Sequence, residues 1–300
     1  MTVTIGTRGS ALALVQSRIV AAALGGDVGL RIISTTGDGS TAPLFQLGDG
    51  VFVTAIEDAL RRGEVDVAVH SLKDLPTAER GDLVIAAIPP RADARDVLIT
   101  RTRGGLPSLP GGAVVGTSSP RRDLFLRAIR PDVTTRPIRG NVDTRLRKVL
   151  EGEYDATILA AAGLERLGIG FTAVEALDLD LWPPAPGQGA LAIQCRADDA
   201  ALRARLAPLD DAATRAAVTA ERALLAALGA SCALALGTYA RCTGGRLILD
   251  AALMDDGLRR THAEGDDPLT VAAEAAAALR AIGPIGPIGP IGQISESARV

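Results

Sequence analysis

Aromatic side chains are scarce in this sequence of 300 residues, where Phe, Trp and Tyr together make up 2%. Proteins that bind single-stranded nucleic acid stack bases on aromatic side chains and usually present basic surfaces. The formal net charge here is −3 at pH 7. Both properties argue against a nucleic-acid partner.

Long apolar runs, targeting signals and common ligand-binding motifs are also missing. No uncharged apolar stretch reaches the ~18–20 residues that a membrane-spanning helix needs, and the first residues lack the pattern of a secretory signal. No GxGxxG or GxxxxGK[ST] motif indicates a nucleotide site, and no Cys/His cluster indicates a metal site. Three cysteines without a paired framework fit a reducing compartment. We therefore expect a cytoplasmic protein with no metal and no membrane partner.

Short apolar runs alternate with helical patterns along most of the chain, which predicts an α/β fold with largely parallel sheets. The predicted strands are Val3–Gly6, Arg31–Thr35, Val65–His70, Leu83–Ile88, Val97–Thr100, Ala113–Gly116, Ala156–Ala160 and Leu191–Cys195. Proline-rich segments at 89–91 and 182–187 mark two boundaries. These patterns leave open which sheet the strand at 191–195 joins.

A smaller unit begins near Asp210. Its pattern predicts a helix that ends at Gly229, a strand at Leu247–Leu253 and an Ala-rich helix at Leu269–Ala281. Beyond it, a Gly-Pro-Ile repeat opens the segment 283–300. Proline at every third position excludes a helix and a central strand, so we expect a disordered or extended tail.

Three turns carry arginine, at 6–10, 116–122 and 139–145. Glycine lets backbone N–H groups approach a ligand, and a helix N-terminus favours anions. Arg121 and Arg122 fall in a first helical turn, where the helix dipole disfavours cations, so we expect them to face a bound anion. Each turn alone could be an ordinary capped turn with solvated arginines. Together, at the carboxyl ends of strands, they predict a site for a ligand with several carboxylates or phosphates.

A fourth motif, VHSLKDLP (69–76), brings His70, Ser71, Lys73 and Asp74 to one sheet edge. As a surface ion pair, Lys73 and Asp74 would contribute under about 1 kcal/mol. As a functional pair, Asp74 would stabilise a cationic substrate or deliver a proton.

The cysteines differ in their expected surroundings. Cys232 lies three residues beyond the predicted end of a helix, in a loop where a thiol is available for chemistry. Cys195 lies inside an apolar strand and is expected to fill the core. Cys242 belongs to no motif, and we interpret it as structural.

Seven stretches together resemble one family, porphobilinogen deaminase (hydroxymethylbilane synthase). They are TRGSALALVQ (7–16), DVAVHSLKDLPT (66–77), VVGTSSPRR (114–122), RPIRGNVDTRL (136–146), LAAAGLERLG (159–168), PAPGQGALAIQCR (184–196) and AVTAERALLAALGASC (217–232). They occur in the family's order and spacing over roughly residues 3–240. No single stretch is decisive, but their collinearity is very specific.

The resemblance implies a monomer with two lobes like those of periplasmic binding proteins and a small α+β domain. Domain 1 would comprise residues 1–90 and 188–209, which returns the strand at 191–195 to the first lobe; domain 2 would be 91–187 and domain 3 would be 210–282. A dipyrromethane cofactor would be attached to Cys232 by a thioether. Four porphobilinogen molecules would be joined to it head to tail with loss of ammonia, and hydroxymethylbilane would be released by hydrolysis. This is a transferase reaction of tetrapyrrole and haem biosynthesis.

The resemblance also implies roles for individual residues. Asp74 falls on the family's catalytic aspartate, which would stabilise the cation left when ammonia departs. Positions that bind the carboxylates and other groups of substrate and cofactor are occupied by Arg8, Ser10, Gln16, Ser71, Lys73, Thr117, Ser118, Arg121, Arg122, Arg139, Arg145, Arg166 and Gln188.

Two loops depart from the family pattern. Gly48-Asp49-Gly50 stands where a Gly-Lys-Gly is frequent, which removes one expected lysine contact. Before Cys232, Ala230-Ser231 replaces two glycines, and Ala235 replaces a proline, so the loop backbone can differ.

Two alternatives to an active enzyme therefore stay open. The first is a non-enzymatic anion-binding protein with the same two lobes, such as a solute receptor or the effector domain of a regulator. The missing signal sequence and the missing helix-turn-helix weigh against these versions, and a binding protein needs no cysteine at 232. The second is a catalytically impaired paralogue, suggested by the two altered loops.

Overall fold

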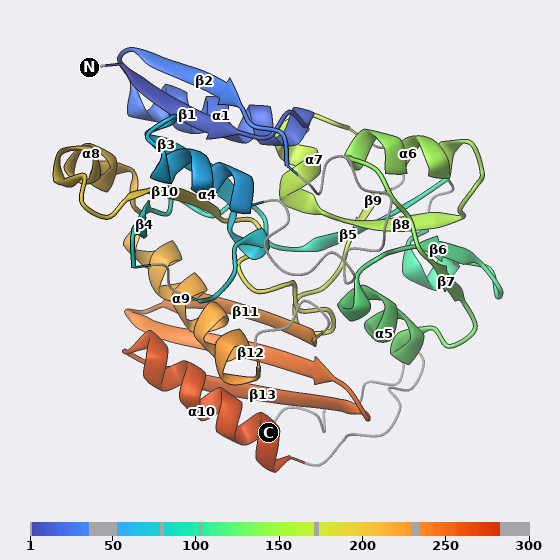
Figure 1. Ribbon diagram of the computed structural model, residues 1–300. Helices are drawn as coiled ribbons and strands as arrows, with labels where there is room; N and C mark the ends of the chain where they lie inside the picture. The colour runs from blue at the N-terminus through green and yellow to red at the C-terminus, as the bar shows by residue number, and fades with distance from the viewer. Residues whose placement is uncertain are drawn as a thin grey trace.

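The computed structural model describes residues 2–35, 53–78, 81–101, 104–170, 174–229 and 234–282. These residues form two five-stranded sheets and one three-stranded sheet, each with its own helices (Figure 1). The predicted α/β class, with two lobes and a small third domain, is confirmed. The sheets are mixed rather than largely parallel, because two of the four strand pairs in each large sheet are antiparallel.

The first lobe is built on a sheet of strand order β2-β1-β3-β10-β4. Its strands are β1 (Val3–Thr7), β2 (Val28–Ile32), β3 (Val67–Ser71), β4 (Leu83–Ala87) and β10 (Leu191–Arg196). Its helices are α1 (Ala11–Leu24), α4 (Thr54–Arg61) and α8 (Ala200–Leu206), with a 3-10 turn at Ala207–Leu209. Val67 and Val69 pack with residues of α1 and α8, whereas Ala68 packs with α4. Helices on both faces explain why these strands are nearly continuous apolar runs.

β10 pairs antiparallel with both β3 and β4, which is the position in the first sheet that the resemblance predicts. Cys195 is fully buried in this strand, so its expected place in the core is confirmed. The limits of the three domains themselves stay a prediction.

The second lobe repeats the arrangement of the first, with strand order β7-β6-β8-β5-β9. Its strands are β5 (Asp96–Thr100), β6 (Val114–Gly116), β7 (Thr134–Arg136), β8 (Ala156–Ala160) and β9 (Val174–Ala176). Its helices are a 3-10 turn at Leu106–Ser108, α5 (Pro120–Ile129), α6 (Val142–Leu150) and α7 (Ala161–Leu167). Val97 and Ile99 face α6 and α7, while Leu98 packs toward α5 and Trp182. Ser119 caps α5 by accepting a hydrogen bond from the Arg122 amide, and Pro120 takes the first helical position.

The third domain is an antiparallel sheet covered by two helices. Its elements are α9 (Ala212–Ala227), β11 (Ala235–Thr243), β12 (Arg246–Met254), β13 (Leu258–Gly265) and α10 (Pro268–Ala281). Leu247, Leu249, Ala251 and Leu253 alternate along β12 and pack against the helices. Ala252 and Met254, on the other face, join the core of the second lobe. Alternation thus buries both faces of the strand.

The hairpin between β11 and β12 turns at Gly244 and Gly245, both with positive φ (60° and 84°). Two consecutive residues with positive φ form a two-residue turn whose twist matches that of the two antiparallel strands it joins. Only glycine adopts these angles without strain.

A buried ion pair ties the two connections between the lobes to α9. Arg91, in the first connection, donates to both carboxylate oxygens of Glu221 in α9 at 2.7 and 3.0 Å. The same carboxylate accepts from the backbone N–H of Gly187, in the second connection, and of Ala240 in β11, each at 2.7 Å. Glu221 is fully buried. One carboxylate therefore joins the two lobes to the third domain.

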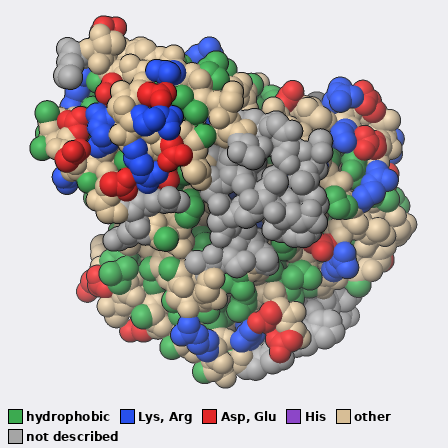
Figure 2. Space-filling view, in the orientation of Figure 1, with side chains coloured by type: hydrophobic (Ala, Val, Ile, Leu, Met, Phe, Trp, Pro, Cys, Tyr) green, Lys and Arg blue, Asp and Glu red, His purple; other side chains and the backbone are tan. Residues whose placement is uncertain are grey.

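Charges are mixed over the first lobe, where Figure 2 shows basic and acidic side chains interspersed. Arg61 of α4 lies 3.0 Å from a carboxylate oxygen of Asp58 and 2.5 Å from one of Asp82, and Arg31 of β2 lies 3.1 Å from Glu64. This face therefore has no field of a single sign.

Two secondary-structure predictions were wrong or incomplete, and one is not tested. The strand expected at Arg31–Thr35 is Val28–Ile32. β7, β9, β11 and β13 were not predicted. The tail at 283–300 lies outside the described residues.

Candidate active site

The turn that follows β3 carries the predicted Lys73–Asp74 pair. A short 3-10 helix, η1 (Leu72–Asp74), begins where the buried strand ends. Leu72 and Leu75 are buried and anchor the turn, while Lys73 and Asp74 are exposed. Within the described part of the chain, the Asp74 carboxylate accepts no hydrogen bond. The turn thus presents two charged groups at the end of a rigid strand. His70 does not join them, because it is buried in β3 with Nε2 3.1 Å from Oε1 of Gln194.

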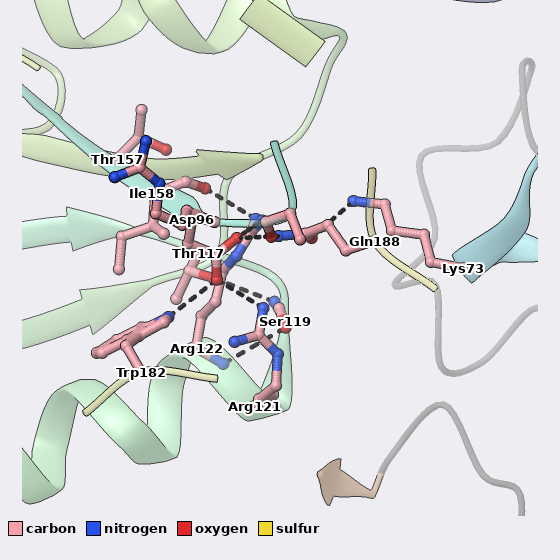
Figure 3. Close-up of polar contacts among 12 residues, drawn as sticks. Lys73, Asp96, Thr117, Ser119, Arg121, Arg122, Thr157, Ile158, Trp182 and Gln188 are labelled. Carbon is pink, nitrogen blue, oxygen red and sulfur yellow. Dashed lines mark hydrogen bonds and ion pairs between the residues drawn. The ribbon is translucent and has the colours of Figure 1, made fainter. Parts of the chain in front are cut away.

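Lys73 connects this turn to the second lobe. Its Nζ donates to Oε1 of Gln188 at 3.1 Å, and Gln188 in turn donates through Nε2 to Asp96 and to the Ala94 carbonyl, both at 2.8 Å (Figure 3). The Lys73 side chain as a whole remains accessible to water. Protein atoms surround its ammonium group, however, and this local burial lowers the pKa of Lys73 to about 8. Asp74 and Asp96 raise that pKa, whereas Arg121 and Arg122 lower it. Lys73 therefore lies within electrostatic reach of all four groups.

Asp96, at the start of β5, is the centre of the junction between the lobes, and the sequence did not single it out. Its side chain is fully buried. It accepts from Arg121 and Arg122 at 2.6 Å each, from Nε1 of Trp182 at 2.9 Å and from Gln188 (Figure 3). Burial alone would raise the pKa of Asp96, but the two guanidinium groups outweigh it and hold that pKa well below its usual range.

Arg121 and Arg122 do not simply face an open anion site, as we predicted from their place in the first turn of α5. Both are buried, and both bind Asp96. Their other terminal nitrogens donate to the carbonyls of Pro183 and Ile158, at 2.9 and 2.8 Å. The Nε groups of both arginines are buried and have no hydrogen-bond partner among the described residues. Two cations thus share one carboxylate, which leaves an excess of positive charge and two unused donors.

Three further arginines of the second lobe add to this charge. Arg145 in α6 is half-buried and donates to the Gly140 carbonyl at 2.9 Å. Burial, together with Arg122 and Arg139, lowers the pKa of Arg145 to about 10. Arg166 in α7 donates to the Gly189 carbonyl, in the connection between the lobes, at 2.6 Å, and burial lowers its pKa. Arg122 and Arg139 are therefore each close enough to Arg145 to repel it.

The predicted hydroxyl and amide residues have local partners. Nε2 of Gln16 in α1 donates to Ser71 Oγ at 2.9 Å, which brings these two together. Ser10 caps α1 through the Ala13 amide at 3.3 Å. Ser118 Oγ donates to the Ile138 carbonyl at 2.8 Å.

The remaining predicted residues are Thr117, Arg8 and Cys232. Thr117 is buried after β6 and accepts from the Ser119 amide at 3.2 Å. Arg8 follows β1 and is half-buried. Cys232, like the altered segments 48–50 and 230–231, lies outside the described residues. Cys242, which we interpreted as structural, is exposed in β11.

No described helix combines the length and apolar character that a membrane span requires. The described His, Cys, Asp and Glu side chains form no group of three or more that could hold a metal ion.

The fold and the site define a two-lobed α/β protein with a small third domain and an excess of cations where its lobes meet. Two family models match this chain: "Porphobilinogen deaminase, dipyromethane cofactor binding domain" over residues 3–204 and "Porphobilinogen deaminase, C-terminal domain" over residues 215–281. The chain belongs to the porphobilinogen deaminase family, whose members are transferases of tetrapyrrole biosynthesis.

Relatives named porphobilinogen deaminase span most of the chain. That of Acidothermus cellulolyticus is 54% identical over 261 residues, which cover 84% of this chain and 78% of the relative. That of Roseiflexus sp. is 50% identical over 255 residues, covering 83% and 84%. That of Mycobacterium leprae is 52% identical over 240 residues, covering 79% and 76%.

Solved structures with a similar course of the chain include two solute-binding proteins. An ancestral cationic amino acid solute binding protein is 15% identical, with a TM-score of 0.42, over 69% of this chain and 87% of its own. The probable amino-acid ABC transporter extracellular-binding protein YtmK of Bacillus subtilis is 10% identical, with a TM-score of 0.38, over 68% and 87%.

Proposed function

We propose that this protein joins four porphobilinogen molecules head to tail on a dipyrromethane held by a thioether at Cys232, and that it releases hydroxymethylbilane. The observation that carries the proposal is the excess of cations at the lobe junction. Arg121 and Arg122 share the carboxylate of Asp96, and Lys73 lies within reach of it. Every pyrrole unit brings an acetate and a propionate, so a growing chain accumulates negative charge. Guanidinium groups bind carboxylates with charge-assisted hydrogen bonds that neutral donors do not match.

The donor chemistry of the junction fits a dipyrromethane. Buried polar groups normally have a hydrogen-bond partner, but the Nε groups of Arg121 and Arg122 have none within the described part of the chain. Carboxylates of a two-ring cofactor supply acceptors to such a cationic site, and we infer that Arg121, Arg122, Arg139 and Arg145 hold them. When bound, the cofactor supplies the pyrrole carbon that forms the new C–C bond and gives up a proton as ammonia leaves porphobilinogen.

Asp74 is the proposed catalytic residue, because it can act directly on the substrate. Breaking the aminomethyl C–N bond of porphobilinogen releases ammonia and leaves positive charge on the pyrrole fragment. An exposed carboxylate offsets that charge and accepts a hydrogen bond from the pyrrole N–H. A fixed charge of this kind acts best on a rigid support, and Asp74 has one in η1, anchored by buried Leu72 and Leu75.

The other residues are proposed to bind and orient the substrate. Lys73 and Arg8 would hold substrate carboxylates on the first lobe, and Arg166 would do so from the second. Ser10, Gln16, Ser71, Thr117, Ser118 and Gln188 would supply neutral hydrogen bonds around them. The proposed enzyme is a cytoplasmic monomer, which analytical ultracentrifugation and cell fractionation can test.

Mass spectrometry of the purified protein tests the proposal. The intact mass should exceed the sequence mass by a dipyrromethane, and peptide mapping should find the adduct on Cys232 but not on Cys195 or Cys242. Acidic aldehyde reagent should colour the denatured protein. Cys232→Ser should lack the adduct and have negligible activity. An unmodified but fully active wild-type protein would refute the mechanism, whereas an unmodified and inactive one would favour the impaired paralogue.

A further inference from the structure

Arg222, in α9 of the third domain, reaches across to the turn that carries Asp74 in the first lobe. Its Nη1 donates to the Leu75 carbonyl at 2.8 Å and, more weakly, to the Leu72 carbonyl at 3.4 Å. Its Nη2 donates to the Pro76 carbonyl at 2.7 Å. One planar group therefore contacts the backbone on both sides of Lys73 and Asp74.

This contact holds a half-buried cation for which the described residues supply no opposite charge. Among the described residues Arg222 forms no ion pair, and burial lowers its pKa. Its neighbour Glu221, by contrast, pairs with Arg91. Carbonyl groups at the end of a helical turn lack partners within the turn, and a cationic donor satisfies them. The fork of a guanidinium suits several carbonyls at once, which an ammonium group matches poorly.

Apolar packing fixes the same turn from the same helix. Val218, one helical turn before Arg222, is fully buried in a cluster with Leu72 and Leu75. The Leu75 amide donates to the Leu72 carbonyl at 3.1 Å and closes the turn. The turn is thus attached to α9 by a hydrophobic contact and by three hydrogen bonds.

The helix that holds this turn also leads to the cofactor cysteine. α9 ends at Ala227, five residues before Cys232 in the sequence. We propose that Arg222 is a positioning residue, which sets the place of the Asp74 carboxylate relative to the helix that leads to Cys232. This inference rests on the proposed function. It gives the third domain a part in aligning the reaction besides holding the cofactor.

The expected effect follows from geometry, because the hydrogen bonds that Arg222 forms with described residues all go to backbone carbonyls that flank Lys73 and Asp74. A displacement of about 1 Å at reacting groups can cost about 100-fold in rate. Arg222→Met removes all the donors and keeps an unbranched chain of similar length. We expect kcat to fall at least about 10-fold while KM for porphobilinogen changes less than about 3-fold.

Arg215→Met is the matched control. Arg215 lies in the same helix and also donates to a backbone carbonyl, but its partners are Asp210 and Ile85. Both variants should carry the cofactor mass. Hydrogen exchange measured by mass spectrometry should accelerate in the peptide 72–77 of Arg222→Met alone, and kcat should fall in that variant alone. Equal kcat in the two variants, or unchanged exchange in 72–77, would overturn the proposal.

A second pair of variants keeps the test decisive if Arg222→Met does not fold. Arg222→Lys and Arg215→Lys retain the charge, and a partial loss of kcat is expected only for the former. Equal kcat in this pair overturns the proposal. If the proposed function itself is wrong, the wild-type protein will lack the adduct and the activity. Hydrogen exchange in the peptide 72–77 would still show whether Arg222 holds the turn.

Discussion

Replacing Asp96 by Asn removes the single negative charge that Arg121 and Arg122 share. The two side chains are nearly the same size, so the change isolates charge from shape. Asn still offers one acceptor oxygen, but Asp96 accepts hydrogen bonds from four side chains. Two buried guanidinium groups would then face each other without a counter-charge.

The magnitude follows from the burial of all three groups. The Asp96 side chain is 0% exposed, and those of Arg121 and Arg122 are 5% and 9% exposed. Breaking a buried pair by removing one partner typically costs about 3–5 kcal/mol. For a chain of this size, an unfolding entropy of about 2.1 cal/mol/K per residue converts that loss to about 5–8 °C in Tm.

The assay compares Asp96→Asn with Asp93→Asn, three residues earlier. Asp93 pairs with Arg95 at the surface, where ion pairs contribute under about 1 kcal/mol. Asp96 also raises the pKa of Lys73, so its loss should move the alkaline limb of the activity profile to lower pH. Scanning calorimetry and a pH–rate profile measure the two effects. If both variants melt together and keep the same profile, Asp96 does not organise the junction.

Three further predictions use the same structure. Asp74→Asn should reduce turnover by orders of magnitude and change Tm little, because the side chain is exposed; near-normal product formation in a porphobilinogen assay would exclude it as the catalytic group. Burial lowers the pKa of His70 to about 4, whereas the unfolded value is about 6.5. The free energy of unfolding should therefore fall by up to about 3 kcal/mol as the pH drops from about 6.5 to about 4. Urea unfolding should show this pH dependence, and His70→Gln should abolish it. The pKa of Lys73 is about 8, so KM for porphobilinogen should rise as pH increases above that value; a profile identical in Lys73→Arg would contradict the role of Lys73 in binding.

Long apolar strands were predictable from sequence, and short edge strands were not. The cap at Ser119 has a local signature, because its partner amide is three residues away. β7 and β9 have only three residues each, largely exposed, and so carry no apolar period. β13 has the sequence LRRTHAEG, which has the polar character of a solvated strand. It was therefore not predicted as a strand, whereas the more apolar β12 was.

The candidate site shows the same division between local and distant partners. The exposed charged turn at Lys73 and Asp74 was predictable, because the apolar strand before it ends there in the sequence. Asp96 was not identified from the sequence because it opens an apolar strand and its four side-chain partners lie 25, 26, 86 and 92 residues away. The unfavourable place of Arg121 and Arg122 in a first helical turn did signal an anion, but the sequence could not tell a ligand from a carboxylate of the protein itself.

The position of β10 has a consequence for how the chain is assembled during synthesis. β10 lies between β3 and β4, and among the described strands it is the one that pairs with β4. Residues 191–196 leave the ribosome only after the whole second lobe has been made. The first lobe therefore cannot complete its sheet while it emerges from the ribosome. More than a hundred further residues must be synthesised before β3 can pair with β10. Non-local strand pairing of this kind slows folding and exposes unpaired edges, so this N-terminal lobe is the part of the chain that most needs protection before release.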